Sequence, residues 1–72
     1  MKIARRENVI DFIYSLDKKR DSVLRILDDE LGREVFIDWF EIKTGISRAE
    51  SCSILLLFVI STNQAIEAAE LL

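Results

Sequence analysis

The spacing of apolar residues predicts helices along most of the chain. In the first segment, four apolar residues recur at i, i+3, i+4 and i+7 and share one helix face: Val9, Phe12, Ile13 and Leu16. A polar stretch over 17–22 interrupts this stripe, which then resumes at Val23, Leu24, Leu27 and Leu31. Residues 1–31 therefore predict either one long amphipathic helix or two helices that meet near Asp21 and Ser22.

Two further local signals refine this first segment. Gly32 directly follows the last apolar residue of the stripe, so we expect it to end the helix as a left-handed cap. Asp21 and Arg25 stand four residues apart, which is the spacing of an ion pair along a helix.

The segment from Glu34 to Thr44 predicts a second, aromatic-rich helix. Phe36 and Phe40 share one face, and the adjoining face carries Val35, Trp39 and Ile42. We expect both faces to pack in the core. Gly45 is expected to end this helix, with Lys43 in the last turn where a cation favours the helix dipole.

The sequence Ser47-Arg48-Ala49-Glu50 matches a capping box, in which the Ser and Glu side chains each accept the other residue's backbone N–H. A helix should therefore start at Arg48 and run to about Ser61. This helix contains seven consecutive apolar residues, 54–60, which point in every direction around the axis. Such a segment is expected to be buried all round.

The remaining segment and the element order predict a mainly α domain. Residues 61–64 break the helix, and 65–72 favour either a C-terminal helix or a short β-strand. We expect one domain over 1–72 with four or five helices: an N-terminal helix or helix pair over 1–31, a helix-turn-helix core over 34–61, and the tail over 62–72.

The composition agrees with a helical protein that acts in the cytoplasm. Half of the residues are apolar, 32% are charged, and the chain has two Gly and no Pro. Cys52 is the single cysteine and cannot form an internal disulfide, which favours a reducing compartment. The apolar run is shorter than the roughly 20 residues that span a bilayer, so no membrane partner is expected.

The sequence offers no catalytic constellation. It contains no His, which removes the commonest general base and metal ligand, and it has no Gly-rich phosphate loop. The acidic run 28–30 lacks the ligand spacing of a calcium loop and reads better as a solvated helix end. Cys52 lies between two serines on the apolar helix, with only Arg48 nearby in sequence to stabilise its thiolate form, which favours a structural role. We therefore expect no enzyme activity, no cofactor, no metal and no small-molecule substrate.

The apolar run is the strongest candidate for an interaction site. A chain of about 70 residues buries a limited share of its surface, so it has little protein with which to enclose such a helix. The run is either a central helix surrounded by the others or a helix partly covered by a partner, which is another protein or a second copy. The residues expected to form core and interface together are Ile54, Leu55, Leu56, Leu57, Phe58 and Val59.

A small helix-turn-helix DNA-binding regulator is the alternative function. The residues that would contact nucleic acid are Lys2, Arg5, Arg6, Lys18, Lys19, Arg20 and Arg48. The charge disfavours this function, because the chain has a net charge of −3 and residues 34–72 hold only two cations, Lys43 and Arg48. A helical homodimer, of viral or other origin, is a further alternative.

The second half of the chain resembles the C-terminal winged-helix domain of kleisins, in particular the segregation and condensation protein A family. The matching stretches lie between about 33 and 70: 35–40, Ser47 to Glu50, the run 54–60, and Ile66 with Glu70 where the family has Gln. The resemblance implies a winged-helix-like fold whose wing is short or absent. It also implies a non-catalytic adaptor that docks on the ATPase head of an SMC protein in chromosome segregation, without contacting ATP.

Overall fold

The computed structural model describes residues 5–72, with Arg5 described by its backbone alone. Five helices make up nearly all of this part of the chain, and none of it forms a strand. They are α1 (Arg5–Asp17), α2 (Arg20–Asp28), α3 (Glu30–Thr44), α4 (Arg48–Ile60) and α5 (Thr62–Glu70). The predicted mainly α fold is confirmed.

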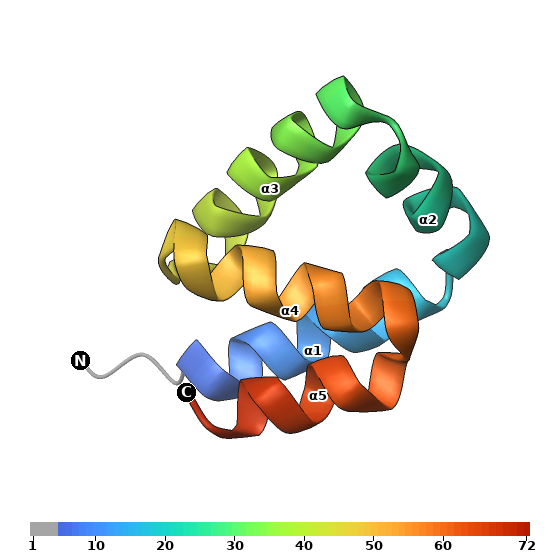
Figure 1. The fold of residues 1–72 in the computed structure, drawn as a ribbon. Coiled ribbons are helices and arrows are strands. Elements are labelled where there is room, and N and C mark those ends of the chain that lie inside the picture. The colour runs from blue at the N-terminus through green and yellow to red at the C-terminus, as the bar shows by residue number, and fades with distance from the viewer. Residues whose placement is uncertain (1–4) are drawn as a thin grey trace.

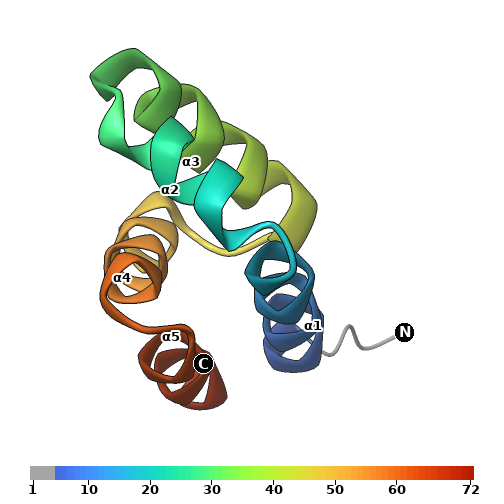
Figure 2. The ribbon, with the colours of Figure 1, turned by 90° about the vertical axis from the view of Figure 1, so that its right-hand side faces the viewer.

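The helices form two groups (Figures 1 and 2). α1, α4 and α5 pack together at one end, with α5 against both α4 and α1. α2 and α3 form a second pair, in which the two helices are inclined to one another, and α3 also contacts α4 and α1. The core lies where α1, α3 and α4 meet, and its largest fully buried side chains are Phe40, Phe58, Ile13 and Ile54.

Residues 5–28 form two helices, which separate at Lys18 and Lys19 rather than near Asp21 and Ser22. Lys19 leaves the helical conformation, with φ −119° and ψ 32°, and its backbone N–H donates to the Leu16 carbonyl at 3.0 Å. The expected position was wrong, and a tertiary contact lies next to the observed break. Thr62 of α5 donates a hydrogen bond to Asp17 at 2.6 Å, directly before the turn.

Gly32 does not end a helix, which corrects the sequence-based expectation. It lies in the first turn of α3, and its N–H donates to the Asp29 carboxylate at 2.8 Å. Asp29 itself separates the two helices, because its extended backbone stops α2 and its side chain caps α3. A Cβ on Gly32 would lie 2.8 Å from the Ile26 carbonyl oxygen, so glycine is needed here for close helix approach.

The predicted end of α3 at Gly45 and the predicted start of α4 after Ser47 are confirmed, whereas α3 starts at Glu30 instead of Glu34 and the break before α5 is Ser61 instead of 61–64. Gly45 adopts the left-handed conformation with φ 74°, and its N–H donates to the Glu41 carbonyl at 2.8 Å. The capping box is complete: the Glu50 N–H donates to Ser47 Oγ at 3.1 Å, and the Ser47 N–H donates to Glu50 Oε1 at 3.0 Å. The C-terminal segment forms the helix α5 rather than a strand.

Three apolar residues that the pattern assigned to buried faces are exposed. Leu31, Val35 and Ile42 are 78%, 67% and 79% exposed, whereas Phe36 and Phe40 are buried as expected. α1, α2 and α4 contact α3, but none of them covers Leu31, Val35 or Ile42. Trp39, at the boundary, is 38% exposed, with its ring centroid 5.0 Å from that of Phe12.

The close approach at Gly32 makes a prediction about stability. Gly32→Ala should lower the free energy of unfolding by about 1–2 kcal/mol, because the added methyl group collides with α2. At an open helix position the same change would stabilise by about 1 kcal/mol. Urea denaturation followed by circular dichroism measures the change. Leu31→Ala, on the exposed neighbour, is the control and should shift stability by less than about 0.5 kcal/mol.

Candidate protein-binding groove

The apolar run of α4 is divided between core and surface. Ile54, Leu55 and Phe58 are buried, while Leu57 is partly buried. Three others are exposed: Leu56 at 63%, Val59 at 46% and Ile60 at 66%. The expectation of a helix buried all round is therefore wrong for this chain taken alone, because its other helices cover one side of α4.

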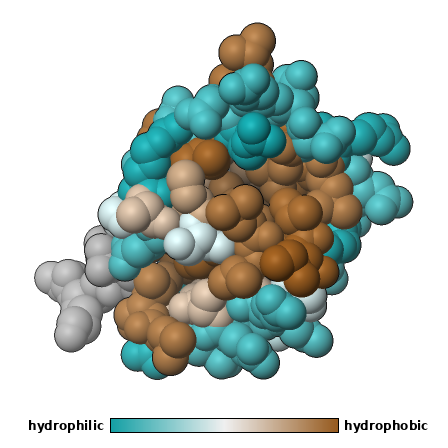
Figure 3. All heavy atoms as spheres, viewed as in Figure 1, coloured by the Kyte–Doolittle hydropathy of each residue, from teal (hydrophilic) through white to brown (hydrophobic). Residues whose placement is uncertain are grey.

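The exposed side of α4 borders a groove that it shares with α2 and α3. The groove has a volume of about 760 Å³, and most of the residues that line it are apolar or weakly polar: Leu24, Leu27, Ile37, Cys52, Leu55, Leu56 and Val59. Charged residues lie along its edge: Asp21, Arg25, Asp28, Arg33 and Glu34. Figure 3 shows this apolar hollow in the middle of one face, surrounded by hydrophilic atoms.

Two arginines fix the position of α2, which forms one wall. At the N-terminal end, Arg20 donates to Thr62 Oγ1 at 2.8 Å and to the Val59 carbonyl at 3.0 Å, and its guanidinium lies 4.7 Å from the centroid of the Phe58 ring. At the other end, Arg33 of α3 donates to the Leu27 carbonyl at 2.9 Å. Because contacts at both of its ends hold α2 in place, the position of this wall is fixed by the fold.

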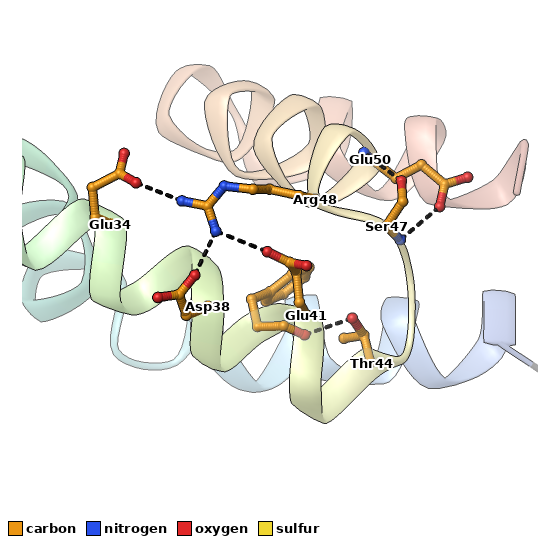
Figure 4. Close-up of polar contacts among 8 residues, drawn as sticks. Glu34, Asp38, Glu41, Thr44, Ser47, Arg48 and Glu50 are labelled. Atoms are coloured by element: carbon orange, nitrogen blue, oxygen red, sulfur yellow. Dashed lines mark hydrogen bonds and ion pairs between the residues drawn. The ribbon is translucent and has the colours of Figure 1, made fainter.

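A cluster of charges joins the other two walls (Figure 4). Arg48, in the first turn of α4, contacts three carboxylates of α3: Glu34 at 2.5 Å, Glu41 at 2.9 Å, and Asp38. We call these four residues the Arg48 cluster. The hydrogen bond that Arg48 donates to the Asp38 carboxylate raises the pKa of the guanidinium above its ordinary value.

The structure separates the cations that were proposed as nucleic-acid contacts. Arg20 and Arg48 are engaged within the protein, as described above. Lys18 and Lys19 are exposed in the turn between α1 and α2, whereas Arg6 is exposed at the opposite end of α1, roughly 18 Å away at 1.5 Å per residue. Lys2 and the Arg5 side chain lie outside the described residues.

Sequence reasoning missed the walls that α2 and α3 supply. Asp21, Arg25 and Asp28 follow one another at i, i+4 and i+7, so they share one exposed face of α2. The expected ion pair between Asp21 and Arg25 does not form, and within residues 5–72 none of the three makes a side-chain hydrogen bond or ion pair. The charge alternation was visible in the sequence, but its place beside a groove depends on the tertiary structure.

Comparison with known proteins gives no match: no family model, curated protein or solved structure is significantly similar to this chain. None of the helices α1 to α5 is both long enough and apolar enough to cross a bilayer.

The contacts of Arg20 lead to a second prediction. Arg20→Ala should lower the free energy of unfolding by about 2 kcal/mol, because two charge-assisted hydrogen bonds and the contact with Phe58 are lost together. Thermal and urea denaturation measure the loss. Arg20→Lys should recover little of the lost stability, since an ammonium group cannot donate to both acceptors with the planar geometry of a guanidinium. Lys19→Ala, next to it and exposed, is the matched control and should be near neutral.

Proposed function

We propose that this protein is a non-catalytic interaction module whose groove binds an amphipathic helix of a partner protein. The observation that carries the proposal is the apolar groove of about 760 Å³, in which Leu56 and Val59 remain exposed. Leaving large aliphatic side chains in contact with water is unfavourable, and contiguous exposed apolar surface generally marks an interaction site.

The shape of the groove favours a helix as its occupant. α2, α3 and α4 surround a concave surface, which a single convex helix can enter with apolar residues at i, i+3 or i+4, and i+7. A two-fold contact between two copies would bring the same surface of each together, so one hollow would face another. A helix of a different protein fills the groove better.

The charges at the edge indicate what this helix carries beside its apolar face. The exposed side chains of Asp21, Arg25 and Asp28 alternate in sign along the α2 wall. A partner helix with Lys or Arg opposite the two aspartates and an acidic residue opposite Arg25 would be complementary in charge. Such complementarity mainly selects the partner and speeds association, while the apolar contacts supply affinity.

A kleisin-like adaptor is the narrower form of this proposal. The resemblance rests on 35–40 in α3 and on the capped, apolar α4, whose outer side lines the groove. The C-terminal segment is helical, so the winged-helix comparison applies to the helix-turn-helix part over 34–61. Under this proposal the occupant is a helix of an SMC-type ATPase head, and the test is binding to a purified head domain.

DNA binding has less support. A helix-turn-helix protein reads bases with the first turns of its second helix, which correspond to α4. The cation in those turns is Arg48, and three carboxylates surround it. A phosphate would have to approach this net negative cluster, so the proposal remains protein binding.

The groove proposal is tested by selecting helical peptides from a displayed library on the intact chain. We expect the selected peptides to carry apolar residues at helical spacing with basic residues beside them. Leu56→Glu should weaken their binding by about 30-fold or more, because a carboxylate would be buried against the apolar face. The fold should persist, since Leu56 is exposed in the free protein.

Ile60→Glu is the matched control, because Ile60 is equally exposed on α4 but does not line the groove. Cys52 is the single cysteine and lines the groove, so a bound peptide should also slow its alkylation. Peptides that bind wild type and Leu56→Glu equally, or that leave Cys52 unprotected, would show that the groove is not the binding site.

A further inference from the structure

A second apolar surface lies on the outer side of α3, away from the groove. Its members are Leu31, Val35, Trp39 and Ile42, which we call the outer stripe; they are 78%, 67%, 38% and 79% exposed. Their spacing of four, four and three residues keeps them within about 80° of one another around the helix. The stripe therefore forms one continuous face along most of α3.

The outer stripe is separate from the groove. Ile37 and Glu34, on a different side of α3, line the groove, and Phe36 and Phe40 enter the core. The Arg48 cluster lies along the border between the outer stripe and the groove, and its member Glu34 also lines the groove. α3 thus presents two apolar surfaces divided by a row of charges.

The charges on the border that the outer stripe shares with the Arg48 cluster are unbalanced, whereas the opposite border carries Lys43. Three carboxylates surround the single guanidinium of Arg48, so two negative charges remain without a cation in the cluster. The side chains of Glu34 and Asp38 are 57% and 64% exposed, and a partner on the outer stripe could reach them. An apolar surface with a negative border is complementary to an apolar surface with a positive border.

From this juxtaposition we propose that the outer stripe docks a second partner, an amphipathic helix whose apolar face is flanked by Lys or Arg. This goes beyond the groove, because it makes the protein a bridge that holds one helix on each side of α3. A second copy of this protein is a less suitable occupant of the outer stripe. An antiparallel two-fold pairing of two α3 helices would put both Arg48 clusters on the same side, where their negative charges repel.

Trp39 is the single tryptophan and reports on the outer stripe directly. The probe is a synthetic helical peptide of about 18 residues, or about five turns, with Leu at i, i+4, i+7 and i+11 and Lys beside them. We expect its binding to shift the Trp39 emission to shorter wavelength, with an affinity that falls as salt rises. The matched control peptide has Glu in place of every Lys and should bind at least about tenfold more weakly.

Variants assign the binding to this surface. Val35→Ser should weaken the binding of the Lys peptide about tenfold, because the apolar side chain that the bound peptide would bury is removed. Leu56→Glu should leave the Trp39 shift unchanged even where the peptide also enters the groove, because Trp39 does not line the groove. The proposal is overturned if the Lys peptide gives no shift, or if Val35→Ser binds as wild type does. Equal binding of both peptides, or a blue shift that appears as the protein alone is concentrated, also overturns it; the latter outcome identifies a second copy as the occupant.

Discussion

Arg20 joins the start of α2 to the junction of α4 and α5, and this contact sets the geometry of the candidate site. Its guanidinium covers Phe58 and donates to the Val59 carbonyl and to Thr62. α2 therefore meets α4 near one end only, while Arg33 holds its other end to α3. The side of α4 that α2 could have covered becomes the wall of a groove.

α3 has a different role on each of its sides. Phe36 and Phe40 anchor it in the core, Ile37 faces the groove, and the outer stripe faces away from the rest of the described chain. Arg48 ties α3 to the start of α4 through three carboxylates. Because these contacts are exposed, their contribution to stability is small, and their main effect is to place a negative border between two apolar surfaces. This arrangement suits a protein that contacts partners from more than one direction.

Local signals predicted the helix ends where the signal and its effect lie in the same few residues. The capping box of Ser47 and Glu50 and the left-handed Gly45 are such cases, since no distant residue is needed to satisfy those backbone groups. Gly32 shows the opposite. Its position after an apolar stripe is typical of a helix cap, but its actual requirement is the absence of a Cβ near the Ile26 carbonyl of another helix. A requirement set by contact between helices has no local signature.

The sequence by itself determined the helical fold, the left-handed glycine that ends α3 and the capping box that starts α4. Helical periodicity indicates which residues share a face, and a capping motif indicates where a helix begins. Neither pattern indicates which helix packs against a given face. The tertiary structure decided that Leu56 and Val59 line a groove, that Val35 and Ile42 stay outside the core, and that Arg20 and Arg48 are bound within the protein. These outcomes depend on how five short helices share a limited core, because each apolar face that another helix does not cover remains at the surface.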